Sequence, residues 1–169
     1  MKREGFSVYE VPSRVAPAPA RTNWPEHHHI SPDGVSDDHF VQREGRCFAG
    51  THLILDFWGA THLDDLQLME SALRECVTNC RATLLHLHLH HFSPNGGISG
   101  VAVLAESHIS VHTWPERSFG AFDIFMCGNA RPEEAVPILE RAFSPRTLHI
   151  SKYLRGEAGE SLIRRKLLS

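Results

Sequence analysis

Hydrophobic and polar residues alternate with the two-residue period of β-strands in several stretches after residue 46. In the first stretch, Leu53, Leu55 and Phe57 form one face of the predicted strand. The other face holds Ile54 between two polar residues, so the strand is apolar on nearly both faces. The predicted strands cover residues 47–58, 82–92, 98–106, 107–114, 119–128 and 146–156. Turn residues at 93–97 (SPNGG) predict a hairpin between the second and third strands, whereas the junction at residues 106–107 carries no turn signal.

Two stretches have the spacing of amphipathic helices. Residues 63–80 place apolar side chains at steps of three and four, with acidic residues in the first turn, where the helix dipole favours them. The apolar face of this helix consists of Leu66, Met69, Leu73, Val77 and Cys80. In residues 131–143, Pro132 suits a first helical turn, while Pro137 predicts a kink or a late start. The order of elements predicts an α+β fold, a two-layer α/β sandwich with a mainly antiparallel sheet and helices on one face.

The chain divides into three parts by composition. Residues 1–45 hold five prolines and a run of three histidines without a sustained period, so we expect a flexible Pro- and His-rich N-terminal extension. The periodic pattern of residues 46–155 predicts one folded domain, and residues 156–169 are expected to form a C-terminal tail.

Charge and hydropathy exclude several classes of protein. Lys and Arg number 17 against 20 Asp and Glu, a net charge of −3 that argues against a non-specific nucleic-acid binder. No run reaches the roughly 18 apolar residues that span a bilayer, so no membrane contact is expected. The first residues lack the apolar core of a secretory signal, which predicts a cytoplasmic protein with reduced cysteines.

Candidate chemistry concentrates between residues 99 and 128, where Ser107 and His112 are five positions apart. On a regular strand these two side chains point to opposite faces, so only a break in the strand would bring them together. By itself such a pair is more typical of a buried hydroxyl and a hydrogen-bonded histidine than of a catalytic site.

Three segments together, HHFSPNGGISG, ESHISVHTWPE and FDIFMCG, resemble the S-adenosylmethionine decarboxylase proenzymes of the short bacterial and archaeal type. The resemblance extends back through GTHLILDFWG and forward to about residue 155. It implies a carboxy-lyase that converts S-adenosyl-L-methionine to its decarboxylated form and CO₂ for spermidine biosynthesis. It also implies a homodimer of processed protomers with sites at or near the interface.

The resemblance assigns a role to each of five residues. The chain would cleave itself between Glu106 and Ser107, converting Ser107 into a pyruvoyl group that forms a Schiff base with the substrate amine. Ser99 would hydrogen-bond the oxyanion or ester during cleavage, and His112 would accept the Cα proton of residue 107. Cys127 would return a proton to the substrate carbon.

Substrate binding follows from the shape of S-adenosylmethionine. Aromatic faces suit its adenine ring and sulfonium cation, which makes Phe92 and Trp114 candidates for stacking. A carboxylate can accept hydrogen bonds from both ribose hydroxyls, and Glu116 is the candidate for this contact. The same residues could equally be core aromatics and a solvated surface carboxylate.

Two other functions remain open at this point. A pyruvoyl-dependent arginine or ornithine decarboxylase would need the same processing residues, since these build the cofactor and not the substrate pocket. A non-processing, His-rich metal-binding module could instead use His86, His88 and His90, three imidazoles on one strand face, to hold zinc. The same histidines could line a polar pocket or a dimer interface, and the resemblance implies no metal.

Overall fold

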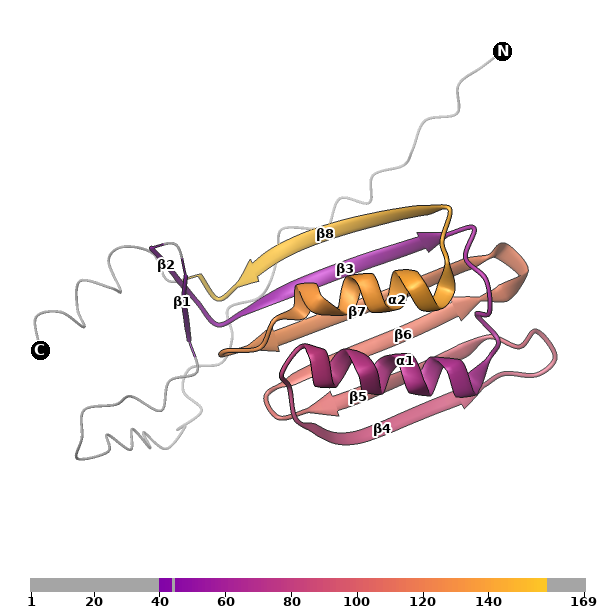
Figure 1. Ribbon diagram of the computed structural model, residues 1–169, viewed down its shortest axis with the longest axis horizontal. Helices are drawn as coiled ribbons and strands as arrows, with labels where there is room; N and C mark the ends of the chain where they lie inside the picture. Colours follow the sequence, from indigo (N-terminus) through magenta and orange to yellow (C-terminus); the bar gives the residue numbers. More distant parts are fainter. Residues whose placement is uncertain (1–39, 44, 158–169) are drawn as a thin grey trace, which may run out of the picture. The chain divides into compact units, whose positions relative to one another are not determined.

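The computed structural model describes residues 40–43 and 45–157, which contain an antiparallel sheet of six strands and two α-helices (Figure 1). In chain order the elements are β1 (Val41–Arg43), β2 (Arg46–Phe48), β3 (Gly50–Trp58), α1 (Leu66–Asn79), β4 (Leu84–His91), β5 (Ile98–Leu104), β6 (Ser107–Trp114), the 3₁₀ turn η1 (Pro115–Arg117), β7 (Phe119–Cys127), the 3₁₀ turn η2 (Pro132–Glu134), α2 (Ala135–Phe143) and β8 (Thr147–Arg155). Residues 1–39 of the expected extension and residues 158–169 of the expected tail lie outside the described residues. At the end of the extension, β1 pairs with β2.

The strands of the large sheet follow the order β4-β5-β6-β7-β3-β8, and every neighbouring pair is antiparallel. Strands β4 to β7 are joined as successive hairpins, and β3 lies between β7 and the last strand, β8. Together with the two helices, which cover one face of the sheet in Figure 1, this confirms the predicted α+β sandwich.

Local sequence explains where the helices begin. Asp65 is the N-cap of α1, and its side chain accepts a hydrogen bond from the Leu68 backbone N–H at 2.9 Å. The predicted apolar face of this helix is buried except for Leu66, which is 38% exposed because it lies in the first turn. Helix α2 begins only at Ala135, after the turn η2, and Pro137 falls within its first turn, where no backbone hydrogen bond is lost.

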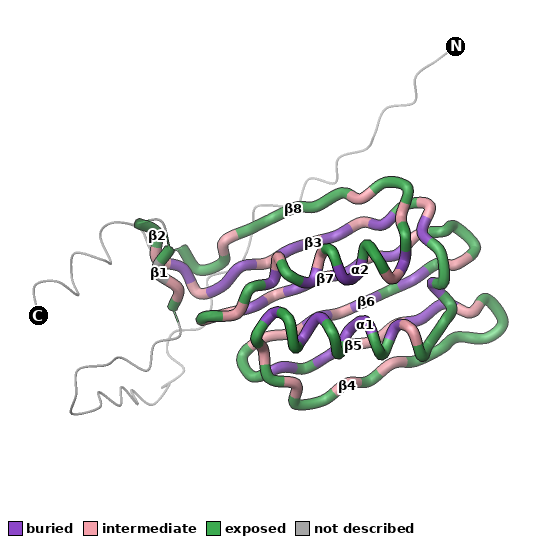
Figure 2. Tube along the Cα trace, in the orientation of Figure 1, coloured by how far each residue is buried: buried purple, intermediate pink, exposed green. Residues whose placement is uncertain are grey.

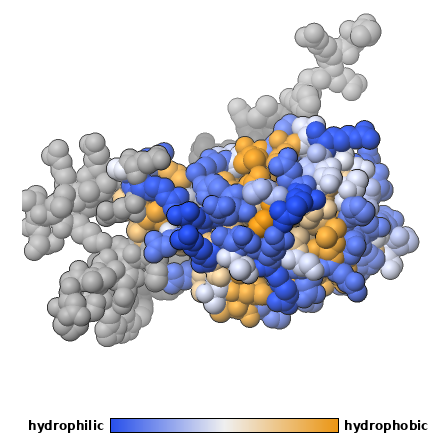
Figure 3. Space-filling view, in the orientation of Figure 1, coloured by the Kyte–Doolittle hydropathy of each residue, from blue (hydrophilic) through white to orange (hydrophobic). Residues whose placement is uncertain are grey.

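The hydrophobic core lies between the sheet and the helices. Leu53, Leu55 and Phe57 of β3 are fully or almost fully buried, as the alternating pattern predicts. Buried positions concentrate in the central strands and the inner sides of the helices, whereas the edge strands β4 and β8 are mostly exposed (Figure 2). The face seen in Figure 3, which bears the helices, is mainly hydrophilic with smaller apolar patches. No helix in the described part of the chain is long and apolar enough to cross a membrane.

The other face of the sheet, here called the open face, is covered by none of the described helices or strands. Strand register assigns alternate residues of each strand to it, among them His52 of β3, Cys127 of β7 and His112 of β6. Large apolar side chains on this face are exposed: Trp58 at 46%, Trp114 at 42%. Exposed large aromatic side chains that lie together on one surface are a common feature of interaction sites.

Candidate active site

Ser99 and His112 face each other across neighbouring strands. They are directly paired in the antiparallel register of β5 and β6, and Ser99 Oγ lies 2.9 Å from His112 Nδ1, within hydrogen-bond distance. Both strands present these side chains to the open face. The serine hydroxyl can therefore donate a hydrogen bond to Nδ1 of the imidazole, and Nε2 takes no part in this contact.

The same end of the sheet forms a hollow of about 390 Å³. Its lining includes Ser99 and His112 together with three further predicted residues, Phe92, Trp114 and Glu116. Phe92 follows β4 and is 48% exposed, and Trp114 ends β6, so both aromatic faces are accessible. We call these five residues the His112 cluster. A hollow of this size with two aromatic walls and one carboxylate is suited to a small organic molecule.

The predicted cleavage point lies at the other end of β6. A two-residue loop joins β5 to β6, and its second residue, Glu106, has a φ of 61°. This left-handed conformation is costly for a residue with a side chain, by about 1–2 kcal/mol, and type II turns normally place glycine there. The peptide before Ser107 is therefore held by a strained residue, in a tight turn that the sequence did not signal.

Ser107 and Cys127 are neighbours across the β6–β7 boundary. The Cys127 backbone N–H donates a hydrogen bond to Ser107 Oγ at 3.3 Å. Burial, and secondarily the nearby Glu106 carboxylate, raise the pKa of the Cys127 thiol. The thiol consequently keeps its proton at neutral pH. We call Glu106, Ser107 and Cys127 the Ser107 cluster.

The two clusters do not meet within one chain. Strand β6 pairs with both neighbours without a register shift, so the break that would be needed to bring Ser107 and His112 together is absent. Five residues of extended strand separate them by about 16 Å at 3.3 Å per residue. The structure thus brings Ser99 and His112 together, and Ser107 and Cys127 together, but leaves these pairs at opposite ends of the strand.

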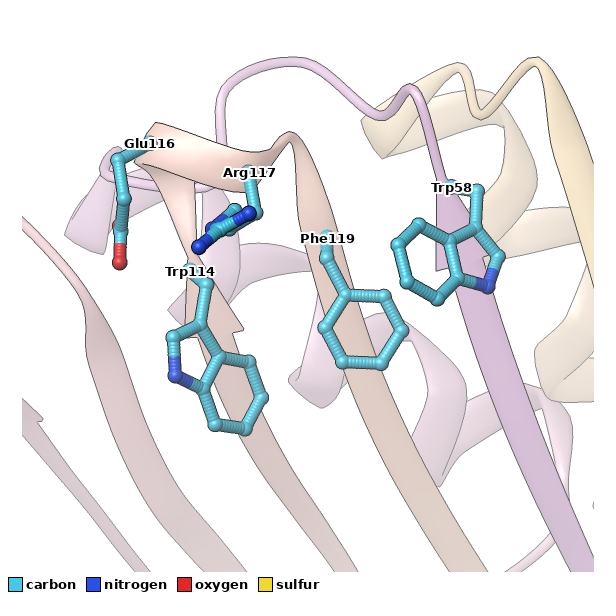
Figure 4. A pocket seen from close by; sticks show the side chains of 5 residues that line it. All are labelled: Trp58, Trp114, Glu116, Arg117 and Phe119. Atoms are coloured by element: carbon cyan, nitrogen blue, oxygen red, sulfur yellow. The ribbon is translucent and has the colours of Figure 1, made fainter. Parts of the chain in front are cut away.

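A second hollow, of about 470 Å³, lies beside Trp114 and shares Glu116 with the first. Trp114, Phe119 and Trp58 come from β6, β7 and β3 and form a row across the open face (Figure 4). The ring centroids are 5.3 Å apart between Trp114 and Phe119 and 4.4 Å apart between Phe119 and Trp58. Sequence reasoning missed this row, although all three aromatics occupy positions that alternation assigns to one face.

A chain of polar contacts also crosses the open face. Arg155 Nη1 lies 3.3 Å from His52 Nδ1, His52 Nε2 lies 3.6 Å from Asp123 Oδ1, and Ser110 Oγ donates to Asp123 Oδ2 at 3.4 Å. Beside them, burial and the proximity of His52 lower the pKa of His108. The contact between Asp123 and His52 depends on β3 pairing with β7, which no local pattern reveals.

His86, His88 and His90 project from the edge strand β4 on the open face. The His86 and His88 rings are parallel, with centroids 6.5 Å apart, and His90 packs edge-to-face against Phe92 at 4.5 Å. Among the residues that the structure describes, no group of three His, Cys, Asp or Glu side chains is arranged to hold a metal ion. The geometry therefore offers no support for the metal-binding alternative.

Comparison with known proteins identifies the family. The family model described as S-adenosylmethionine decarboxylase matches residues 51–156. An S-adenosylmethionine decarboxylase proenzyme of Thermomicrobium roseum is 42% identical over 108 residues, covering 63% of this chain and 93% of that protein. One of Methanococcus maripaludis is 44% identical over 110 residues, with 63% and 89% covered.

A solved structure leads to the same family. The adenosylmethionine decarboxylase of Aquifex aeolicus superposes with a TM-score of 0.58 at 28% identity, covering 67% of this chain and 95% of that one. The family match takes in both clusters, since it includes every residue from Phe92 to Cys127. This chain therefore belongs to the S-adenosylmethionine decarboxylase family.

Proposed function

We propose that this chain is a self-processing decarboxylase that converts S-adenosyl-L-methionine to CO₂ and decarboxylated S-adenosylmethionine. The decarboxylated product is the aminopropyl donor for spermidine. The family assignment supports the reaction class, and the relatives named above are called proenzymes. The observation that carries the proposal is the Ser107 cluster: a serine hydroxyl that follows a left-handed Glu106 and accepts a hydrogen bond from the Cys127 backbone.

Cleavage needs only side chains of the protein and one water molecule. The Ser107 hydroxyl adds to the Glu106 carbonyl, the amide C–N bond breaks, and an ester links Glu106 to the Ser107 side chain. A base then removes the Cα proton of residue 107, the Cβ–O bond breaks, and Glu106 leaves as a carboxylate. Hydrolysis of the resulting enamine releases ammonia and leaves a pyruvoyl group at residue 107. The strained loop favours the first step, because it raises the energy of the bond that must break.

The pyruvoyl ketone supplies the electron sink that decarboxylation requires. The chain's own residues orient the reactants and move protons. Cys127 is next to Ser107, and its raised pKa keeps the thiol protonated, so we assign to it the proton that replaces CO₂ on the substrate carbon.

The hollow of the His112 cluster is the proposed substrate pocket. The Phe92 and Trp114 rings offer stacking faces for adenine and the sulfonium, and the Glu116 carboxylate offers acceptors for the ribose hydroxyls. Ser99 and His112 line the same hollow.

We further propose that two copies complete each site. A two-fold axis in the plane of the open face and perpendicular to the strands would lay the Cys127 side chain and the cleavage loop of one chain over the His112 cluster of the other. One operation would then complete two identical sites, as closed two-fold symmetry requires. The exposed apolar side chains of this face, Trp58 and Trp114 among them, suit a second copy as occupant. His112 would then accept the Cα proton of the partner chain.

Turnover of purified, cleaved protein tests the substrate. Release of CO₂ is measured with S-adenosylmethionine, free arginine and free ornithine, each as the only substrate. We expect release from S-adenosylmethionine alone, because neither amino acid has a ring to stack on Phe92 or Trp114. Equal or faster release from arginine or ornithine would contradict the assignment.

A further inference from the structure

Thr113 lies between His112 and Trp114, but its side chain points away from the open face into the core. It is 6% exposed, and Thr51 is the other buried polar residue among those described. A hydroxyl in the core is costly unless it is hydrogen-bonded, so its partners show what it holds in place.

The Thr113 hydroxyl joins three segments. It accepts a hydrogen bond from the Ile98 backbone N–H at 2.7 Å and donates one to the Leu63 carbonyl oxygen at 2.8 Å. Ile98 begins β5, and Leu63 lies in the connection between β3 and α1. Both bonds are buried and short, so they resist displacement by water.

These bonds extend the pairing of β5 with β6 by one residue. The backbone register of the two strands ends at the pair Ser99 and His112. Beyond it, the Ile98 N–H is held by the Thr113 side chain. The strands also come unusually close here, since a Cβ on Gly97 would lie 2.8 Å from the Thr113 carbonyl oxygen. Ser99 and His112 are therefore the last backbone pair of β5 and β6, and the hydrogen bond between Ile98 and Thr113 holds the two strands together just beyond them.

We propose that Thr113 is a positioning residue for the processing reaction, whose hydroxyl holds β5 and β6 together so that Ser99 Oγ stays within hydrogen-bond distance of His112 Nδ1. This role rests on the proposed function, in which Ser99 and His112 act on the Ser107 segment. Thr113 itself touches no reacting atom, and it acts only through its two neighbours on the strands.

Three variants separate positioning from general stability. Thr113→Val keeps the shape and removes the hydroxyl, Thr113→Ser keeps the hydroxyl, and Thr51→Val removes the other buried hydroxyl, in β3. We expect Thr113→Val to slow chain cleavage and pyruvoyl formation by about tenfold, since small misplacements of catalytic groups have large effects on rate. Thr113→Ser and Thr51→Val should stay within about twofold of wild type, and CO₂ release per pyruvoyl group should not change.

A second measurement does not depend on activity. In an uncleaved Ser107→Ala background, the NMR chemical shift of His112 Nδ1, which reports its hydrogen bond with Ser99 Oγ, is compared at one fixed pH in the parent, Thr113→Val, Thr113→Ser and Ser99→Ala. Loss of positioning should move the shift in Thr113→Val towards that of Ser99→Ala, while Thr113→Ser keeps the shift of the parent. An unchanged shift in Thr113→Val overturns the inference, as does equal slowing of cleavage by Thr51→Val. If the wild-type chain were never cleaved, the proposed function would fail while the chemical shift still decided the role of Thr113.

Discussion

Ser107 and His112 stand at opposite ends of the same unbroken strand, β6, about 16 Å apart at the usual rise per residue. Each has its own local partner, the Cys127 backbone for Ser107 and Ser99 for His112. A strand is too stiff to fold back on itself without breaking its pairing on both sides. On the proposed roles, one chain holds two halves of a processing site, and a second copy is the simplest source of the missing half.

Complementation between two inactive variants tests this arrangement. Ser107→Ala removes the pyruvoyl precursor and His112→Ala removes the base, so each variant alone should form no active site. Refolded together in equal amounts, half the dimers are mixed and each has one intact site, so CO₂ release should return to about a quarter of wild type. Mass spectrometry should find the pyruvoyl group only on the His112→Ala chain.

The matched control pairs two variants from the same cluster. Ser107→Ala mixed with Cys127→Ala leaves every composite site with one defect, so turnover should stay at the level of the separate variants. If the first mixture also restores nothing while both variants still dimerise, the two-fold arrangement is wrong.

Aromatic side chains of the pocket should affect substrate binding and not self-cleavage. Phe92→Ala and Trp114→Ala each remove one stacking face, and we expect KM for S-adenosylmethionine to rise by about three- to tenfold. Cleavage should proceed at about the wild-type rate, because none of the processing steps assigned to Ser99, Ser107 and His112 uses either ring. Tyr153→Leu, on the edge strand β8, is the control for losing an exposed aromatic. A slowed cleavage with unchanged KM would contradict these roles.

Cys127 should be needed for turnover and dispensable for processing. Its contact with Ser107 is made by the backbone N–H, which Cys127→Ala retains, so this variant should be cleaved normally. Loss of the proton donor should lower kcat by about 10²- to 10⁴-fold. An uncleaved Cys127→Ala chain, or one with full turnover, would refute the assignment.

In a plot of kcat against pH, the loss of activity on the alkaline side should report the ionisation of the Cys127 thiol. Burial first, and Glu106 second, raise the pKa of Cys127, and the reaction needs the protonated form. Activity is thus retained at neutral pH and lost only as pH rises through that elevated pKa. Glu106→Gln removes the electrostatic contribution and should move this loss of activity to lower pH in the fraction of protein that is cleaved. A loss of activity at an unchanged pH would show that Glu106 does not act on the thiol.

Protonation of His108 should contribute to the loss of folding stability as the pH falls. Burial and the neighbouring His52 lower the pKa of His108, so the unfolded chain binds a proton more readily than the folded one. The stability due to the neutral imidazole is present above the ordinary histidine pKa and is lost as pH falls through it. Urea midpoints between about pH 8 and pH 5 should drop less in His108→Gln than in wild type. An identical drop would assign the acid sensitivity to other groups.

Much of the fold was predictable because each element has a local pattern. Alternation in β3 separated Leu53, Leu55 and Phe57, which are buried, from the residues between them, and Pro137 indicated the late start of α2. Leu66 was placed on the apolar face of α1 but is 38% exposed, because it lies in the first turn of the helix.

The site was harder to predict, because it depends on pairing between strands. The resemblance identified Ser99 and His112, but their contact requires a two-residue loop at Glu106, a position without turn residues. The Thr113 clamp and the Trp58–Phe119–Trp114 row depend in the same way on which strands are neighbours. Periodicity indicated that Ser107 and His112 point to opposite faces unless the strand is broken, and the structure shows a continuous strand.

Intact-mass analysis of freshly purified protein tests the central claim most directly. If Ser107 breaks the bond before it, the spectrum will show two fragments, residues 1–106 and residues 107–169, and the smaller will carry a carbonyl in place of the Ser107 amine. A carbonyl-specific reagent will then label only the smaller fragment. A single species with the mass of the whole chain, unlabelled after prolonged incubation, would contradict the account.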